Sequence, residues 1–285
     1  MLFYDSDRIK ILKDILPFLN ESSGSVFVIK YGGAAMKDLT FVESFVQDVL
    51  LLRSLGIKPV IVHGGGPFIN DWLNKLDIVP KFHNGLRITD SDTIKIVEMV
   101  LSGQVNKYLV SLFNKYDALA VGLSGKDANF INCIPLFPEL NNFVAKVNTI
   151  DTSILNLLVS HNYIPIISSI ACSDQGYTYN INADSVAGAV AGALKADKLF
   201  LLTDTPGIMK DINDISSVIR FLSIDEISNL KNNKIINGGM IPKVDACICA
   251  LKEGVHKSYI IDGRLKHSLL YEIFTNTETG TILTY

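Results

Sequence analysis

Short runs of Val, Ile and Leu alternate along the chain with stretches in which apolar residues recur every three or four positions. The runs lie at 25–30, 59–63, 118–123, 164–170 and 198–202, and the periodic stretches at 38–55, 91–115, 151–160 and 184–194. A continuous apolar run between helical patterns is typical of a parallel strand that is covered on both faces. The pattern therefore predicts an α/β protein, a three-layer α/β/α sandwich around a mostly parallel central sheet.

Two segments depart from this alternation. Residues 5–19 carry apolar side chains at helical spacing behind candidate capping residues, which predicts an amphipathic helix that ends near Pro17. Residues 125–150 predict an antiparallel hairpin and a crossover. Because no linker or repeat divides the rest, we expect an N-terminal helix over 1–22 and a single domain over 23–285. Its two lobes are expected to be about 23–180 and about 181–285.

Composition narrows the classes of partner. Among 285 residues, 26 are Lys or Arg and 29 are Asp or Glu, a net charge of −3, so no basic field exists to attract nucleic acid or a membrane surface. No signal peptide or long apolar run is visible, and the four cysteines lack metal-site spacing, so we expect reduced core cysteines. The abundance of Lys, Ile and Asn is typical of an AT-rich genome. We expect a soluble protein of a plastid stroma (chloroplast), if organelle-encoded, or otherwise of a bacterial cytoplasm.

Glycine clusters directly follow the first two predicted strands. Gly32 and Gly33 come after 25–30, and Gly64, Gly65 and Gly66 come after His63. Ligands bind at the carboxyl ends of parallel strands, where glycine lets backbone N–H groups approach phosphate oxygens. The alternative is a pair of tight turns, with His63 as a structural residue. No P-loop motif, no G-x-G-x-x-G and no G-x-S-x-G is present, which argues against P-loop, dinucleotide-dependent and hydrolase functions.

Three later segments carry candidate polar groups. Asp184 falls in the first turn of an Ala- and Gly-rich helix, where it is either a plain cap or a placed carboxylate. Thr203 and Asp204 end an apolar strand before a Pro-Gly turn. Lys243 lies just inside a helix that follows the glycine loop at 237–239. Taken alone, Lys30 or Lys243 could be a solvated surface charge.

Six segments occur in an order that resembles the amino acid kinase family, and within it the members that act on N-acetyl-L-glutamate. They are VIKYGG, VIVHGGGP, GLRITD, NINADSVAGAVAGAL, LLTDTPGI and GGMIPKVDA. The resemblance extends from about residue 24 to the C-terminus and implies a carbamate kinase-like fold. It implies phosphorylation of the side-chain carboxylate of N-acetyl-L-glutamate by ATP with Mg²⁺, a step of arginine biosynthesis. Glutamate 5-kinase, carbamate kinase, UMP kinase and a non-catalytic nucleotide-binding protein remain alternatives.

The resemblance also implies roles for single residues. A carboxylate nucleophile is already ionised at neutral pH, so the reaction needs positioning and charge neutralisation rather than a general base. By resemblance, Lys30 and Lys243 neutralise the transferring phosphoryl group, and Asp184 holds both lysines. Substrate-binding positions are Gly64, Gly65, Gly66, Arg87 and Asn180, and nucleotide-binding positions are Gly32, Gly33, Thr203, Asp204, Gly207 and Asn237. No metal ligand from the protein is expected.

Regulation is a separate expectation from the same resemblance. The N-terminal helix resembles the extension that joins three dimers into a hexamer in arginine-inhibited members, and the tail over 260–281 resembles their arginine site. His267, Glu278 and Gly280 are the candidate arginine contacts, although Lys266 stands where the family pattern has Pro. We therefore expect a homohexamer that arginine inhibits, with a PII-type signalling protein as a candidate partner.

Overall fold

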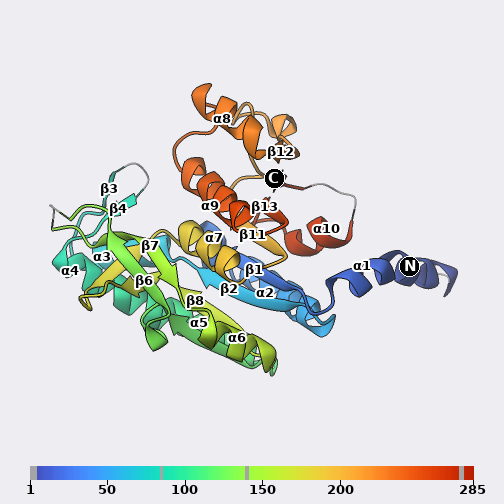
Figure 1. Ribbon diagram of the computed structural model, residues 1–285, viewed down its shortest axis with the longest axis horizontal. Helices are drawn as coiled ribbons and strands as arrows, with labels where there is room; N and C mark the ends of the chain where they lie inside the picture. Colours follow the sequence, from blue (N-terminus) through green and yellow to red (C-terminus); the bar gives the residue numbers. More distant parts are fainter. Residues whose placement is uncertain (1–4, 84–85, 139–140, 276–278) are drawn as a thin grey trace.

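An eight-stranded sheet runs through the middle of the computed structural model, which describes residues 5–83, 86–138, 141–275 and 279–285 (Figure 1). Its strand order is β12-β14-β13-β11-β1-β2-β8-β5. The strands from β13 to β5 are all parallel, whereas β14 runs antiparallel to β13. The bounds are β1 (Val26–Tyr31), β2 (Lys58–His63), β5 (Ala120–Ser124), β8 (Ile164–Ser168), β11 (Lys198–Thr203), β12 (Phe221–Ser223), β13 (Lys257–Asp262) and β14 (Thr281–Thr284).

Helices cover both faces of this sheet, and alternate strand residues separate two cores. In β1, Phe27, Ile29 and Tyr31 join one core, while Val28 joins the other. The first core is closed by η1 (Ala34–Lys37), α2 (Leu39–Ser54), α3 (Gly66–Lys75), α4 (Ser91–Glu98), α5 (Asn106–Asn114) and α10 (Ser268–Phe274). The second is closed by α6 (Ser153–Ser160), α7 (Ala183–Ala193), α8 (Ile224–Asn232) and α9 (Met240–Lys252). The predicted sandwich with a mostly parallel sheet is confirmed.

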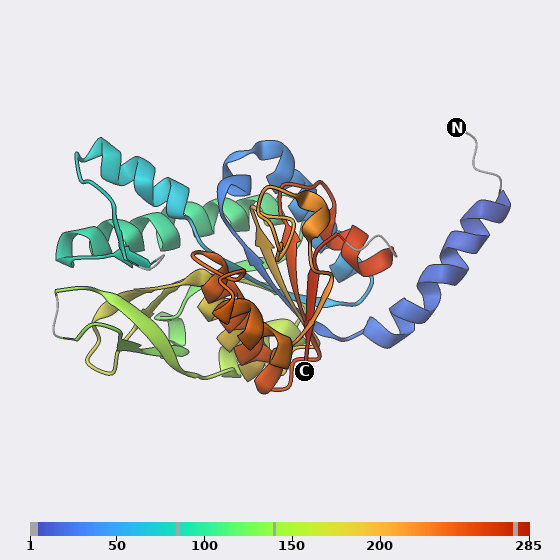
Figure 2. The same cartoon turned by 90° about the horizontal axis from the view of Figure 1, so that it is seen from above.

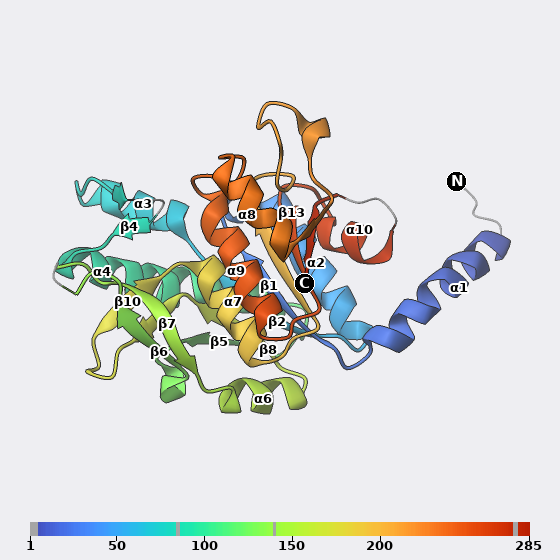
Figure 3. The ribbon, with the colours of Figure 1, turned by 45° about the horizontal axis from the view of Figure 1, so that its top comes forward.

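A second, smaller sheet lies beside the central sheet, where Figure 3 labels β6, β7 and β10. It closes in the order β10-β7-β6-β9, and its strands are β6 (Ile131–Pro135), β7 (Val144–Ile150), β9 (Ile170–Cys172) and β10 (Thr178–Ile181). β6 and β7 are antiparallel, which confirms the predicted hairpin. A further hairpin is formed by β3 (Lys81–His83) and β4 (Leu86–Ile88).

The predicted helix over 91–115 is not a uniform α-helix. Between α4 and α5, the segment η2 (Met99–Val105) is π-helical, and the N–H of Asn106 donates to the carbonyl of Leu101 five residues earlier. An apolar pattern does not distinguish this widened turn from an ordinary one, because both keep the same face buried over a short distance.

The N-terminal helix α1 (Asp5–Ser22) projects away from the sheet (Figure 2). The prediction that it ends near Pro17 was wrong, because the helix continues through Pro17 to Ser22. A proline inside a helix removes one helical hydrogen bond. The residue after Pro17, Phe18, packs edge to face on Phe274, with the ring centroids 4.9 Å apart. Lys198 lies 5.0 Å from the same Phe18 ring, so α1 is fastened at its C-terminal end.

The four cysteines are free, and Cys133 and Cys247 are buried as expected. Cys249 is exposed, contrary to the expectation of a core position, because two residues along a helix turn the side chain away from the face that Cys247 occupies. In the described part of the chain, no helix is long and apolar enough to span a membrane.

Candidate active site

Lys30 and Asp184 meet at the carboxyl edge of the central sheet. Lys30 lies one residue before the end of β1, on the face of the strand that α7 covers. The cap of α7 is Asn182, whose side chain accepts from the Ser185 N–H, so Asp184 is free of the plain capping role and occupies the first turn. Its Oδ1 lies 2.9 Å from Lys30 Nζ.

Lys243 approaches the same carboxylate from α9. Its Nζ donates to Asp184 Oδ2 over 2.8 Å. The small residues of α7 make this approach feasible, since a Cβ added at Gly188 would lie only 2.5 Å from the backbone oxygen of Ala246 on α9. The close packing of two helices therefore brings Lys243 to Asp184, and both oxygens of Asp184 receive an ammonium group.

The buried setting and the neighbouring charges shift the pKa values of Asp184 and Lys30. Burial by itself would raise the pKa of Asp184, but the charges of Lys30 and Lys243 outweigh burial and lower that pKa to about 2. Burial also lowers the pKa of Lys30, an effect that Asp184 opposes. Two ammonium groups and one carboxylate leave an excess positive charge, which suits an entering phosphoryl group.

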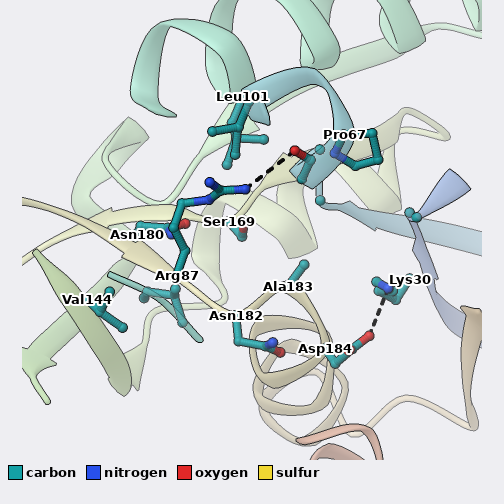
Figure 4. A pocket seen from close by; sticks show the side chains of 17 residues that line it. Lys30, Pro67, Arg87, Leu101, Val144, Ser169, Asn180, Asn182, Ala183 and Asp184 are labelled. Carbon is teal, nitrogen blue, oxygen red and sulfur yellow. Dashed lines mark hydrogen bonds and ion pairs between the residues drawn. The ribbon is translucent and has the colours of Figure 1, made fainter. Parts of the chain in front are cut away.

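A pocket of 260 Å³ opens on the Lys30 side of this cluster (Figure 4). Arg87 of β4 lines it, and the Arg87 Nη2 donates to Asn70 Oδ1 over 2.6 Å and points to the Gly66 carbonyl. Burial lowers the pKa of Arg87 to about 10, so the guanidinium stays charged at neutral pH. Of the predicted positions, the pocket collects Lys30, Gly32, Gly33, Gly64, Gly65, Gly66, Arg87, Asn180 and Asp184.

A second pocket, of 770 Å³, opens on the Lys243 side. The Thr203 hydroxyl, at the end of β11, donates to Asp204 Oδ1 over 3.1 Å. The predicted positions in this pocket are Thr203, Asp204, Gly207, Asn237 and Lys243. Lys243 lines this pocket and its partner Asp184 lines the first, so the lysine–carboxylate–lysine cluster lies where the two pockets approach each other.

Several residues in or beside the first pocket were not predicted from the sequence. Ser169 follows directly after β8, at the same sheet edge as the glycine loops, so the rule that pointed to Gly64 could have found it. Leu101 and Val144 reach the pocket from η2 and from the small sheet, and no local signal marks them. Asn70, which holds Arg87, was also missed, because the contact joins α3 to a hairpin later in the chain.

The candidate regulatory residues are elsewhere. His267 precedes α10, and its ring Nδ1 lies 2.6 Å from Asp48 Oδ1. The backbone N–H of His267 donates to Ser44 Oγ. The carbonyl of Gly280 accepts from Arg220. Glu278 lies outside the described residues. Neither His267 nor Gly280 lines either of the two pockets.

The second pocket offers hard oxygen donors to a cation, among them Thr203, Asp204 and Asp211. Within the described ranges, no group of three or more His, Cys, Asp or Glu is arranged to hold a metal ion. The hydroxyl of Thr203 and the carboxylate of Asp204 are hard oxygen ligands, which fit Mg²⁺ when phosphates and water supply the rest of its coordination.

Comparison with known proteins identifies the family of the chain. The profile of the amino acid kinase family matches residues 25–262. The acetylglutamate kinase of Gracilaria tenuistipitata var. liui is 54% identical over 97% of this chain and 98% of its own length, and that of Thermosynechococcus vestitus is 50% identical over 98% and 95%. Carbamate kinase from Giardia lamblia bound to AMP-PNP shares the fold, with a TM-score of 0.67 at 18% identity over 92% of this chain and 99% of that one.

These matches confirm the resemblance stated above, and they cover nearly the whole chain rather than a fragment. The matched region contains both pockets and the charged cluster between them. The chain belongs to the amino acid kinase family and is a kinase.

Proposed function

We propose that this kinase transfers the γ-phosphoryl group of ATP to the side-chain carboxylate of N-acetyl-L-glutamate. One observation carries the proposal: Lys30 and Lys243, each from a different pocket, converge on the two oxygens of Asp184. The relatives at about half identity over the full chain act on this acceptor by name. Two substrates in two pockets would thus react beside a shared positive cluster.

The first pocket suits the acceptor. The Arg87 guanidinium would hold the α-carboxylate through two parallel hydrogen bonds, and Asn180 would contact the acetamido group and the α-carboxylate. The side-chain carboxylate would then point to Lys30. The N–H of Gly64 already donates to the Tyr31 carbonyl, which leaves the N–H groups of Gly65 and Gly66 as the donors of this strip.

The second pocket suits the nucleotide. Lys243 would contact the transferring phosphoryl group, with Thr203, Asp204, Gly207 and Asn237 around the rest, and Gly32 and Gly33 would meet the phosphates from the first pocket's side. Mg²⁺ bound with ATP would neutralise phosphate charge, held in part by the oxygens of Thr203 and Asp204. The first pocket draws its lining from residues up to 184 and the second from 203–243, which supports two lobes that meet near residue 180.

The chemical step needs no proton removal. A side-chain carboxylate oxygen attacks the γ-phosphorus, the bond from that phosphorus to the β,γ-bridging oxygen breaks, and ADP leaves with the bonding pair. The product is an acyl phosphate. Lys30 and Lys243 stabilise the charge on the phosphoryl oxygens during transfer, and Asp184 keeps both ammonium groups in place.

A hydroxamate assay tests this function. Hydroxylamine traps an acyl phosphate formed from ATP and Mg²⁺ with N-acetyl-L-glutamate, and glutamate, aspartate, and bicarbonate with ammonia are run in parallel. Product from N-acetyl-L-glutamate alone is the expected result. Product from another acceptor only, or ADP release with UMP only, would assign the chain to a different activity within its family.

We also propose that arginine inhibits the enzyme and that α1 joins dimers into a hexamer, with a PII-type protein as a further partner. One support is that α1 projects from the body (Figure 2). The other is that Phe18 of α1 packs on Phe274 of α10, the helix that follows the candidate His267. Deleting residues 1–20 should reduce the particle size and the arginine sensitivity. If both stay unchanged, this regulatory proposal is wrong.

For the compartment, we propose a plastid stroma or a bacterial cytoplasm.

A further inference from the structure

His63 ends β2 directly before the glycine strip, and the mechanism above does not use it. Its side chain is fully buried and lies on the face of β2 opposite to the one that α7 covers. The ring Nδ1 lies 2.9 Å from the Gly64 carbonyl oxygen. A carbonyl can only accept, so Nδ1 must carry the proton and Nε2 must be an acceptor.

Asn106 satisfies that acceptor. Its side-chain Nδ2 lies 3.1 Å from His63 Nε2 and also donates to the Ile166 carbonyl over 2.8 Å. Asn106 Nδ2 also lies 3.4 Å from the Leu123 carbonyl oxygen, so its two hydrogens are directed at His63 Nε2 and at backbone carbonyls, and Asn106 fixes both the ring orientation and the tautomer of His63. Burial, with the nearby charge of Lys107, lowers the pKa of His63 to about 4, so the ring is neutral at physiological pH.

The π-helical segment explains why Asn106 reaches His63. In η2 the N–H of Asn106 bonds to the carbonyl of Leu101, so these residues stack one turn apart although five positions separate them. Leu101 packs against the glycine strip as well, since a Cβ at Gly65 would lie 2.6 Å from Leu101 Cδ2. One widened helical turn therefore places Asn106 against His63 and Leu101 against Gly65.

We propose that His63 and Asn106 are positioning residues for phosphoryl transfer, which hold the Gly64–Gly65 peptide so that the Gly65 N–H points into the first pocket. The peptide is trans, so the N–H lies opposite to the carbonyl that His63 holds. His63 does not line the pocket whereas Gly65 does, which places the N–H edge of the peptide on the substrate side. This inference rests on the proposed function for the identity of the substrate, and on hydrogen-bond geometry alone for the orientation.

The tautomer of His63 is the first test, and it needs no activity. Long-range ¹H–¹⁵N correlation spectra of the wild-type protein, with the signals of His63 assigned by the His63→Asn variant, should show the proton on Nδ1. Free histidine favours Nε2, so a proton on Nε2 of His63 would overturn the proposal.

Kinetics of matched variants provide the second test. His63→Leu removes the donor to Gly64, and we expect kcat to fall about 100-fold with the KM for ATP unchanged within about twofold, because a donor aimed at the phosphoryl group is misplaced. His63→Asn keeps an N–H near the Nδ1 position and should restore most of kcat. Asn114→Ala is the control, because Asn114 ties α5 to β5 through two hydrogen bonds to Ala120 but lines neither pocket. Equal kcat in His63→Leu and the wild type would contradict the proposal.

The Asn106→Asp variant adds a pH readout that a purely structural role would not produce. At low pH, one proton lies between the introduced carboxylate and His63 Nε2. The other ring proton then stays on Nδ1, which still donates to the Gly64 carbonyl. When one proton is lost at higher pH, the single proton left on the ring lies on Nε2, where the carboxylate accepts a hydrogen bond from it. Nδ1 is then unprotonated, so the Gly64 carbonyl loses its donor. Activity should therefore fall with rising pH in this variant only; a profile parallel to the wild type would refute the mechanism. If the wild type forms no hydroxamate, the proposed function fails while the tautomer still decides the orientation.

Discussion

Lys30 and Lys243 belong to opposite halves of the chain, yet their ammonium groups bind the two oxygens of one carboxylate, 2.9 Å and 2.8 Å away. In the sequence, each lysine taken alone could be a solvated surface charge. Asp184 makes them a unit, because the buried Asp184 carboxylate and the buried Lys30 ammonium group each require an opposite charge, and the partly buried Lys243 adds a second cation to the same carboxylate. The cluster thus connects the stability of the fold with its chemistry.

Replacing Asp184 by Asn should lower both the unfolding free energy and the enzymatic activity. The two ammonium groups would lose their counter-ion in a buried site, and removal of one partner from such a pair costs about 3–5 kcal/mol of unfolding free energy. Denaturant unfolding measures this loss, and the hydroxamate assay should show activity reduced about 100-fold or more, because both lysines lose their positions. Asp245→Asn, which breaks the exposed ion pair with Lys231, is the control and should cost less than about 1 kcal/mol.

The same carboxylate predicts how stability changes at acid pH. Its pKa in the folded protein is about 2, below the ordinary value of 3.8, so the unfolded chain takes up a proton first as pH falls. The stabilisation is complete above about pH 4 and is lost towards pH 2, an amount of about 2 kcal/mol. The difference in unfolding free energy between the wild type and Asp184→Asn should shrink by this amount over the same pH range. A constant difference between them would show that Asp184 titrates normally.

Lys30→Met and Lys243→Met should each lower kcat by about 100- to 1,000-fold, as expected when one donor to a developing charge is removed. Lys252→Met, at the exposed end of the same helix α9 as Lys243, should leave kcat near the wild-type value. Both catalytic variants should still bind substrate. Full activity in either would place the transferring phosphoryl group elsewhere.

Arg87→Lys should act on acceptor binding. An ammonium group cannot reproduce the two parallel bonds of a guanidinium, so the KM for N-acetyl-L-glutamate should rise about 10- to 100-fold. The KM for ATP should change little, because Arg87 lines only the first pocket. Arg264→Lys, at an exposed ion pair with Asp262, is the matched control. An equal rise in both KM values would mean that the substitution disturbs the fold rather than one pocket.

Gly188→Ala should separate the helices that carry Asp184 and Lys243. The added methyl group would meet the Ala246 backbone, and relief of such overpacking costs about 1–3 kcal/mol. Activity should fall together with stability. Gly103→Ala, which meets open space, should change the unfolding free energy by less than about 1 kcal/mol. Wild-type activity in Gly188→Ala would show that the helix spacing is not critical.

The sequence by itself determined the strands β1, β2, β5, β8 and β11 of the central sheet, the sandwich and the glycine loops. Continuous apolar runs force burial on both faces, and glycine after a strand marks a close backbone approach, so these features follow from neighbouring residues alone. The positions of Lys30, Gly65 and Arg87 were predicted in this way or by resemblance, and the structure collects them in one pocket.

Only the tertiary structure decided which of these residues meet. Taken by itself in the sequence, Asp184 is either a plain cap or a placed carboxylate, and only the resemblance implied that it holds both lysines. In the structure, those lysines come from a strand and a helix that the strand order and the α7–α9 contact bring together. The π-helical turn, the Asn70–Arg87 bond and the continuation of α1 past Pro17 were likewise invisible. Local patterns record which face of an element is buried, whereas contacts between distant elements depend on how those faces pack, a property of the whole chain.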